Sequence, residues 1–332
     1  MKRPVAYIAG TGRALPKRVV TNHDLEAGGL DTNDEWIVER TGIRQRYICG
    51  EGESTRSLAA EAARKAMAKA GVSAGEIDLI VVGTATPDRL LPSAACDIQA
   101  ELGATRAGAF DVSAACSGFI YSCLVAEGML ATGTSETALV IGVEKLSSIV
   151  NWQDRNTAII FGDGAGAAII RRSRAAQGGR GILSTYVRSD GTLSELLWRP
   201  SGGAERPYDQ AVEAEKSQYV QMAGREVFKH AVRSMSEATD RALDQAKLTA
   251  SDIDLIIPHQ ANIRIIEATA KHAGVPMSKV YVNVDMYGNT SAASVPIALD
   301  EAMQTGRLRE GMTALLVAFG AGFTWGSMVV RI

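Results

Sequence analysis

An internal duplication constrains this chain more than any other feature of its sequence. The stretch AGVSAGEIDLI at 70–80 matches AKLTASDIDLI at 246–256, an offset of 176 positions. At the same offset, ETALVIG at 136–142 matches MTALLVA at 312–318, and SLAAEAARKAMAKA at 57–70 matches RSMSEATDRALDQA at 233–246. Because three segments align in order at one offset, we expect an N-terminal half over 1–172 and a C-terminal half over 173–332.

Both halves have the pattern of an α/β protein. The runs IDLIVVGT at 77–84 and IDLIIPH at 253–259 are continuously apolar, which is typical of parallel strands covered on both faces. Ala-rich helical stretches precede them, and this alternation predicts helix and sheet layers. Each half ends in a Gly-rich turn and a strand, FGDGAGAAIIRR at 161–172 and FGAGFTWGSMVVRI at 319–332. Extra chain is expected around 144–159 and as a loop over roughly 188–216.

Composition narrows the class of protein. Apolar residues make up 46% of the 332 residues, charged residues 22%, and the net charge is −2. This balance is typical of a soluble globular chain and argues against a general binder of nucleic acid or membrane surfaces. We expect no apolar stretch of membrane-spanning length. The four cysteines form no CxxC pair and lack the spacing of zinc ligands. We also expect no secretory leader, and therefore a protein that works in the reducing cytosol.

One cysteine stands at a predicted strand-to-helix junction. Cys116 lies in FDVSAACSGFIYSCLVAEGML, where small residues separate a strand end from an apolar helix. A thiol at a helix N-terminus meets free amide groups and the positive end of the helix dipole, so we expect a lowered pKa and a nucleophilic thiolate. The residues by themselves leave a second interpretation open, a small buried apolar side chain. Cys123, one helical face further along, is expected in the core.

A histidine and an asparagine occupy similar junctions in the second half. His259 follows the strand IDLII, at the sheet edge where α/β proteins bind ligands, and Asn289 lies in VDMYGNTSAAS. Taken singly, His259 fits a structural histidine equally well, and Asn289 fits an ordinary N-cap. The duplication brings the ends of both halves together across a pseudo-twofold axis. It therefore predicts one pocket that contains Cys116, His259 and Asn289.

Taken together, the motifs resemble a known family. DVSAACSGF, FGDGAGA, PHQAN, YGNTSAAS and FGAGFTWG, with DEWIVERTGIRQR near the start, are similar in order to the signatures of β-ketoacyl-acyl carrier protein synthase III. The resemblance covers essentially the whole chain. It implies the thiolase fold, an internally duplicated five-layer αβαβα sandwich, usually a cytoplasmic homodimer. FGDGAGA is better interpreted as a tight structural turn than as a nucleotide site.

The resemblance also implies a two-stage reaction. Cys116 would take a short acyl group from coenzyme A; malonyl-acyl carrier protein would then lose CO₂ and attack the thioester. His259 and Asn289 would donate hydrogen bonds to the enolate oxygen, and the backbone amides of Cys116 and Ala321 would serve acyl transfer. The coenzyme A thioester is a substrate, and no cofactor, metal, nucleic acid or membrane is expected.

Substrate contacts are implied in the same way. Trp36 and Arg155 would sandwich the adenine of coenzyme A, and Arg40 would contact its phosphates or pantetheine. Without the resemblance these residues are an ordinary surface tryptophan and solvated arginines. The resemblance assigns pantetheine and its phosphate to Gly224, Phe228, Asn262 and Arg264. It assigns the acyl pocket to Leu91, Leu146, Phe161, Leu197 and Met222, with Leu91 reaching into a neighbouring subunit. It assigns carrier-protein docking to Lys229, Gln260, Arg264 and Lys271.

Several alternatives stay open at this point. A polyketide starter enzyme or a hydroxymethylglutaryl-CoA synthase would have the same fold, although no carboxylate base can be placed for the latter. A degradative thiolase is disfavoured, because FGAGF lacks the second cysteine which that chemistry needs. The order Cys, His, Asn also suits a cysteine hydrolase. An inactive acyl-CoA-binding scaffold is disfavoured by the intact triad.

Overall fold

The first half builds a mixed five-stranded sheet. The computed structural model describes residues 5–173 and 179–332. The strand order is β1-β7-β6-β4-β5; β4 runs parallel to both β5 and β6, whereas β7 is antiparallel to β6 and β1. The strands are β1 (Ala6–Ala14), β4 (Leu79–Gly83), β5 (Gly108–Val112), β6 (Thr137–Glu144) and β7 (Gly164–Arg172).

The second half repeats this sheet. Its order is β11-β12-β13-β8, with β11 and β12 parallel and the other neighbours antiparallel. A bridge between Ile256 and Val280 marks the place that β5 holds in the first sheet. The strands are β8 (Gly181–Ser189), β11 (Leu255–Pro258), β12 (Thr313–Gly320) and β13 (Thr324–Arg331). β6 and β12 start 176 positions apart, which confirms the duplication and its offset.

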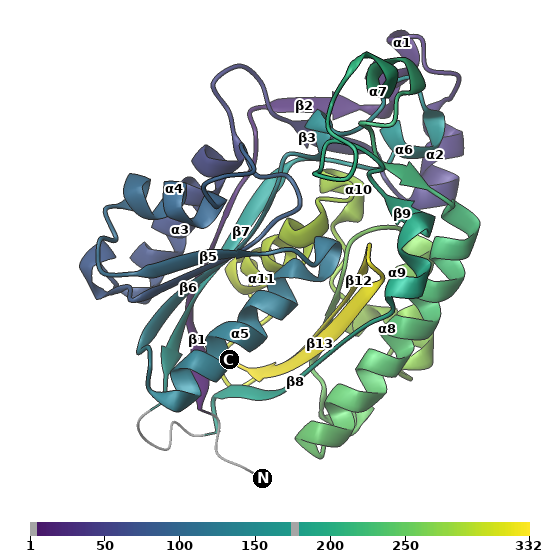
Figure 1. Cartoon of the computed structure of the whole chain (residues 1–332). Helices are drawn as coiled ribbons and strands as arrows, with labels where there is room; N and C mark the ends of the chain where they lie inside the picture. The colour runs from purple at the N-terminus through teal and green to yellow at the C-terminus, as the bar shows by residue number, and fades with distance from the viewer. Residues whose placement is uncertain (1–4, 174–178) are drawn as a thin grey trace.

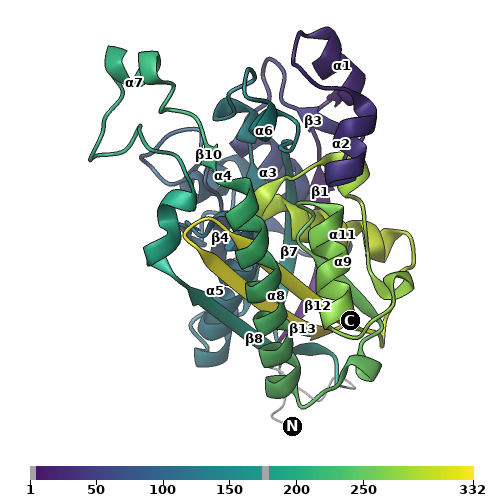
Figure 2. The ribbon, with the colours of Figure 1, turned by 90° about the vertical axis from the view of Figure 1, so that its right-hand side faces the viewer.

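Helices cover both faces of each sheet and complete five layers (Figures 1 and 2). α3 (Thr55–Ala70) and α4 (Ala94–Leu102) cover the outer face of the first sheet, and α8 (Gly224–Ala246) and α9 (Ile263–His272) cover the outer face of the second. α5 (Gly118–Thr132) and α11 (Ser294–Gln304) lie between the sheets. The arrangement is the expected duplicated αβαβα sandwich.

The strands are apolar throughout because both faces are covered. In β4, Leu79 and Val81 belong to the core between the sheets, whereas Ile80 and Val82 belong to the core under α3. Successive side chains in a strand point to opposite faces, so a strand between two helix layers needs an apolar residue at every position.

The central helix corrects one expectation. Residues Ala115–Thr132 are long and apolar enough to span a membrane by length and composition, so the expectation that no such stretch exists is wrong. Half of this segment is buried inside the protein, and Phe119, Ile120 and Leu130 are packed in the core between the two sheets. A helix with protein on both sides is apolar around most of its surface for the same reason as the strands.

Shorter elements surround the end of the sandwich at which Cys116 and His259 lie. The segment expected as a loop over 188–216 contains the end of β8, a two-residue strand and a short helix. The elements are β2 (Arg18–Thr21), α1 (Asn22–Ala27), α2 (Asp34–Thr41), β3 (Gln45–Ile48), α6 (Arg155–Ala158), β9 (Leu197–Trp198), α7 (Gln210–Glu215), β10 (Gln221–Met222) and α10 (Val284–Tyr287). The 3₁₀ turns are η1 (Ala74–Glu76), η2 (Ala115–Ser117), η3 (Leu146–Ser148), η4 (Gly191–Leu196), η5 (Ala250–Asp252), η6 (Met277–Lys279) and η7 (Ser291–Ala293).

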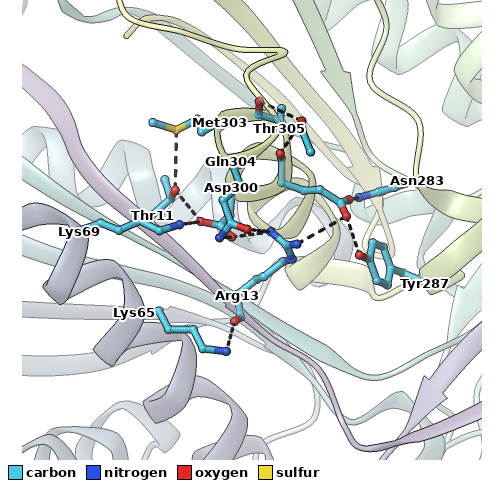
Figure 3. A network of polar contacts seen from close by, with 12 residues as sticks. Thr11, Arg13, Lys65, Lys69, Asn283, Tyr287, Asp300, Met303, Gln304 and Thr305 are labelled. Atoms are coloured by element: carbon cyan, nitrogen blue, oxygen red, sulfur yellow. Dashed lines mark hydrogen bonds and ion pairs between the residues drawn. The ribbon is translucent and has the colours of Figure 1, made fainter.

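A buried carboxylate ties the two halves together (Figure 3). Asp300 of α11 has a fully buried side chain and accepts hydrogen bonds from Thr11 Oγ1 at 2.8 Å, Arg13 Nη1 at 2.8 Å and Lys69 Nζ at 2.6 Å. Thr11 and Arg13 lie on β1, and Lys69 lies on α3. The central layer is therefore held to the first sheet by charge-assisted hydrogen bonds as well as by apolar packing.

Candidate active site

Cys116 lies where β5 gives way to α5. The residue before it, Ala115, has φ of 45°, which lies in the left-handed region and turns the chain sharply into the helix. The start of α5 lies so close to β4 that a Cβ on Gly83 would be 2.6 Å from the carbonyl carbon of Gly118. Glycine is therefore required there, and this close approach seats the thiol between the sheets.

The electrostatics of Cys116 differ from the expectation. Its side chain is 8% exposed, and burial raises the pKa of the thiol to about 12, while a hydrogen bond with the Ser291 side chain acts in the opposite direction. The buried Glu144 carboxylate raises the pKa of Cys116 further. The expectation of a lowered pKa is wrong, because desolvation of the thiolate outweighs the hydrogen bonds that favour it.

His259 directly follows β11. Its amide donates to Val317 O at 2.8 Å and extends the pairing with β12, which holds the side chain at the sheet edge. Burial lowers the pKa of the imidazole to about 3, so the ring is neutral at physiological pH. Its Nδ1 is buried without a hydrogen-bond partner among the described residues. A neutral imidazole has one N–H donor and one acceptor nitrogen.

Asn289 is held rigidly by its backbone and by its own carbonyl oxygen. Its amide donates to Ile160 O at 2.9 Å, and its carbonyl accepts from the Gly162 amide at 3.0 Å. The side-chain Oδ1 accepts from the Ser291 amide at 2.8 Å. Gly288 before it has φ of 63°, and a Cβ there would be 2.8 Å from Ile160 O. Since Oδ1 is occupied, Asn289 presents the Nδ2 donor to the site.

All three side chains line one cavity, which we call the active-site cavity. Its volume of about 200 Å³ is below the roughly 300–1,000 Å³ of ordinary ligand pockets, so the cavity is small. Of the other predicted residues, Phe161, Leu197, Met222, Gly224, Phe228 and Asn262 also line it. The rest of the lining is apolar and was not among the predicted residues: Ile160, Val227, Ala231, Met235, Ala261, Ile265 and Phe319.

Two predicted acyl-pocket residues lie outside this lining. Leu146 packs with Val150 and Ala158 behind Phe161, so it supports the wall of the active-site cavity without forming its surface. Leu91 lies in the loop after β4 and is 86% exposed, next to Leu90 at 79%. Within a single chain, Leu91 contributes nothing to the cavity.

The turn between β12 and β13 lies against the nucleophile. A Cβ on Gly320 would be only 2.6 Å from the Cys116 amide nitrogen, so no larger residue fits there. Ala321 follows at once, outside the β12–β13 ladder. This placement is compatible with the predicted role of the Ala321 amide beside that of Cys116.

At the predicted adenine site, Arg155 packs directly on Trp36. The guanidinium groups of Arg40 and Arg155 lie 4.6 and 4.8 Å from the centre of the Trp36 ring, and Arg155 Nη1 donates to the carbonyl of Asp31 at 2.9 Å. A ring inserted between two stacked groups needs about 7–8 Å between them. Arg155 must therefore move before an adenine can enter.

The predicted docking residues fall into two groups. Lys229, Arg264 and Lys271 are exposed on α8 and α9, and we call them the basic patch. Gln260 is 1% exposed; it donates to Pro258 O and Tyr281 O, and its Oε1 accepts two backbone amides. The prediction that Gln260 docks a carrier protein is wrong, because its amide is buried and fully used in joining loops.

The FGDGAGA motif is structural, as expected. The carboxylate of Asp163 is fully buried and accepts from the Cys49 amide at 2.8 Å, the Ser147 amide at 2.9 Å and Ser147 Oγ at 2.6 Å. The turn thus joins β3 and η3 to the start of β7.

Sequence reasoning missed two polar residues beside Cys116. Glu144 at the end of β6 is fully buried and accepts from Ser291 Oγ at 3.0 Å, and η7, which carries Ser291, packs against η2, which carries Cys116. A signal was present, since the 176-residue offset aligns η2 and α5 with η7 and α11. It pairs Ser291 with Ala115, and both have left-handed backbone conformations.

Comparisons with known proteins give the family of the chain. Family models described as 3-oxoacyl-[acyl-carrier-protein] synthase III and its C-terminal part match residues 110–191 and 243–332. The β-ketoacyl-[acyl-carrier-protein] synthase III of Xylella fastidiosa strain Temecula1 is 51% identical over 330 residues, covering 99% of each chain. That of Symbiobacterium thermophilum is 51% identical over 329 residues, covering 99% of this chain and 98% of the relative.

Solved structures of this family superpose on almost the whole chain. The 3-oxoacyl-[acyl-carrier-protein] synthase III of Aquifex aeolicus VF5 superposes with a TM-score of 0.90 at 46% identity, covering 98% of this chain and all of that one. A priming β-ketosynthase from the R1128 polyketide pathway superposes with a TM-score of 0.91 at 36% identity, covering 99% and 96%. This chain therefore belongs to the β-ketoacyl-[acyl-carrier-protein] synthase III family of condensing acyltransferases.

Proposed function

We propose that Cys116 accepts an acyl group from an acyl-coenzyme A and that the acyl-enzyme then condenses with malonyl-acyl carrier protein. The observation that carries the proposal is the convergence of three side chains on one small cavity. Cys116 supplies a nucleophile, and His259 and Asn289 supply neutral hydrogen-bond donors.

In the first stage, the Cys116 thiolate attacks the thioester carbonyl and coenzyme A leaves as its thiolate. The tetrahedral oxyanion needs donors aimed at its position, and the amides of Cys116 and Ala321 are our candidates. Because burial raises the pKa of Cys116, little thiolate is present beforehand, so the thiol must give up its proton before or during the attack.

In the second stage, CO₂ leaves malonyl-acyl carrier protein and the negative charge moves to the thioester oxygen. His259 N–H and Asn289 Nδ2 would hold this enolate oxygen. Its carbon then attacks the acyl carbonyl on Cys116 and releases the β-ketoacyl product and the free thiolate. The low pKa of His259 fits this role, since a neutral imidazole stabilises the enolate without having to protonate it.

Substrate and partner contacts are proposed from exposed residues. Trp36 and Arg155 would clasp the adenine of coenzyme A once Arg155 has moved. The basic patch would dock an acidic carrier protein. The exposed side chains of Leu90 and Leu91 would be covered by a second copy of the chain, with Leu91 reaching towards the partner's acyl pocket. We expect the enzyme to work in the cytoplasm.

Covalent acylation tests the proposal directly. Incubation with acetyl-coenzyme A followed by peptide mass mapping is expected to place an acetyl thioester on Cys116. Cys123 is the internal control, since it is fully buried in the neighbouring helix. Acetyl groups on Cys49, Cys96 or Cys123 in place of Cys116 would contradict the assignment.

A second candidate is a starter enzyme for polyketides, supported by the likeness to the R1128 priming ketosynthase. Such enzymes share the two-stage chemistry and differ in the primer. Rates with acetyl-, isobutyryl- and octanoyl-coenzyme A separate the two candidates, because the small cavity is expected to favour short primers in an enzyme of fatty acid synthesis. Membership of this family argues against the interpretation as a cysteine hydrolase.

A further inference from the structure

The carboxyl group of Glu144, at the end of β6, is fully buried and is held in one orientation by the loop after β4. The Ala85 amide donates to both of its oxygens, at 3.1 and 3.2 Å, and the hydroxyls of Thr84 and Thr86 bond to Oε2. Each hydroxyl accepts a backbone amide, Thr84 from Thr86 at 3.1 Å and Thr86 from Lys145 at 2.8 Å, and so keeps its proton for the carboxylate. Because these donors are tied to the backbone, the carboxylate is fixed in place.

The Oε1 atom of this carboxylate binds Ser291 of η7. Ser291 Oγ donates to Oε1 at 3.0 Å. The backbone of Ser291 has φ of 48°, a left-handed conformation that persists in a residue other than glycine only where the surroundings impose it. Gly142 and Glu144 face the same side of β6, and a Cβ on Gly142 would be 2.1 Å from the carbonyl oxygen of Ala292. The strand therefore leaves η7 no room to shift towards it, and Glu144 binds η7 at that position.

The position of Ser291 decides which end of the Asn289 amide faces the active-site cavity. That side chain has an acceptor end, Oδ1, and a donor end, Nδ2. The Ser291 amide donates to Oδ1 at 2.8 Å, and an N–H group binds only the acceptor end. Nδ2 is thereby left for the cavity, which Asn289 lines. If Ser291 turned, the amide of Asn289 would be free to rotate and to present Oδ1 in place of its donor.

We propose that Glu144 is a positioning residue for Asn289 and that it acts through Ser291. The carboxylate holds the Ser291 hydroxyl, the Ser291 amide holds the acceptor end of the Asn289 side chain, and Nδ2 stays aimed at the enolate oxygen. Glu144 itself touches no substrate. The inference rests on the proposed function, because it concerns how one of the two enolate donors of that reaction is held.

The hydrogen-bonding capacity of Glu144, and not its charge, explains why a carboxyl group stands here. A negative charge near a developing enolate opposes it, so the charge gives the reaction no advantage. A carboxylate has two oxygens and about four sites for donors, and the donors present are the Ala85 amide and the hydroxyls of Thr84, Thr86 and Ser291. The hydrogen bond to Ser291, rather than the charge, is therefore the feature to test.

A double-mutant cycle on CO₂ release from malonyl-acyl carrier protein tests this coupling. Every variant is made in Cys116→Ala, the parent, because the Glu144 charge acts on the thiol and enolate formation does not need the thiol. Ser291→Ala removes the hydroxyl that Glu144 holds, and Ala115, at φ of 45°, shows that alanine adopts this backbone conformation in this chain. We expect it to lower kcat for CO₂ release about ten- to a hundredfold with little change in KM, because small displacements of a positioned group cost up to about 10²-fold.

The second arm of the cycle starts from Asn289→Ala. If Ser291 acts only through the Asn289 amide, Ser291→Ala is expected to slow this variant by no more than about twofold further. Ser294→Ala is the matched control, since it removes another buried hydroxyl of the same segment, whose partner is the Gln260 amide at 2.7 Å. Its effect is expected to be equal with asparagine and with alanine at position 289.

Two substitutions of Glu144 separate its hydrogen bond from its charge. Glu144→Gln keeps the shape of the side chain and loses the charge. With its oxygen towards the Ala85 amide, its Nε2 can donate to the lone pairs of Ser291 Oγ, so we expect it to keep most of the CO₂ release of the parent. Glu144→Ala removes the bond as well, and its CO₂ release is expected to fall as far as that of Ser291→Ala. If Ser291→Ala does not fold, Glu144→Ala takes its place in the cycle.

The outcomes that would overturn the proposal are distinct from a failure of the proposed function. Losses that multiply when Ser291→Ala and Asn289→Ala are combined would show that Ser291 does not act through Asn289. A Glu144→Gln variant as slow as Glu144→Ala would show that the charge matters and the hydrogen bond does not. Coupling of Ser294 to Asn289 as strong as that of Ser291 would indicate a general disturbance of the segment. Asn289→Ala that releases CO₂ at the parent rate would overturn the proposed function itself, and the inference with it.

Discussion

Replacing Asn289 by aspartate changes one atom in the proposed enolate site. The variant keeps the shape of the side chain and the oxygen that accepts from the Ser291 amide at 2.8 Å. It exchanges the Nδ2 donor for an oxygen. The backbone bridge with Phe161 does not involve the side chain, so we expect the fold to be retained.

The expected fall in the decarboxylation rate follows from the loss of one hydrogen-bond donor. Removal of a single oxyanion donor costs about 10²–10³ in rate, or about 2.7–4 kcal/mol. Aspartate adds a negative charge beside a developing enolate, so we expect decarboxylation to fall at least by the upper end of that range at neutral pH. A carboxyl group in this buried site should have a raised pKa, and its neutral form can donate a hydrogen bond. Decarboxylation by Asn289→Asp is therefore expected to recover partly as the pH falls.

The assay separates the two chemical stages. CO₂ release from malonyl-acyl carrier protein reports enolate formation, and acetyl transfer from acetyl-coenzyme A to Cys116 reports the first stage, which should change much less. Asn262→Asp is the matched control, since Asn262 lines the same cavity but its Nδ2 donates to Arg40 O at 2.9 Å. We expect the control to affect KM more than kcat.

Two outcomes would refute this reasoning. Decarboxylation by Asn289→Asp within tenfold of the wild-type rate would show that Nδ2 does not hold the enolate. An equal loss in both stages would indicate a general disturbance of the cavity, or a role for Asn289 in acyl transfer.

Three further predictions follow from other parts of the molecule. Arg264→Glu in the basic patch is expected to raise KM for malonyl-acyl carrier protein strongly and KM for acetyl-coenzyme A far less. An equal rise in KM for both substrates would assign Arg264 to the pantetheine phosphate that both carry. Asp300→Asn is expected to lower the free energy of unfolding by about 2–4 kcal/mol, measured by urea denaturation, because Arg13 and Lys69 lose the negative charge that pairs with them and one of its two acceptor oxygens; an unchanged midpoint would refute the tie between halves. Since the pKa of His259 is about 3 when folded and about 6.5 when unfolded, the unfolded chain binds the extra proton below pH 6.5. Stability should then decline by up to about 1.4 kcal/mol per pH unit on acidification, and His259→Gln should show a shallower decline.

The strands and the order of the elements could be predicted, because they depend on residues that are close together in the sequence. Apolar runs such as 77–84 follow from strands covered on both faces, and the duplication sets the order of elements in the second half from the first. The structural role of FGDGAGA was expected from its Gly-rich pattern, but the partners of Asp163, at Ser147 and Cys49, lie 16 and 114 residues away in the sequence.

Predictions failed where the outcome depended on packing between distant segments. Gln260 looks like any polar residue at a loop, but its amide is buried among carbonyls and amides brought from 258 to 284. The pKa of Cys116 was expected to fall from its helix-start position, yet burial between two sheets raises it. Desolvation depends on everything that surrounds a group, and a sequence window contains little of that.

By itself, the sequence determined the duplicated α/β architecture, the junctions that bear Cys116, His259 and Asn289, and the family to which the chain is similar. Periodicity, helix starts and Gly-rich turns are local properties, so a linear pattern records them. Only the tertiary structure decided that Glu144 and Ser291, 147 residues apart in the sequence, bond to each other near Cys116, and that Asp300 bonds β1 across almost the whole chain. These contacts arise because two similar halves pack face to face, and the partners of a buried polar group are then chosen by proximity in space.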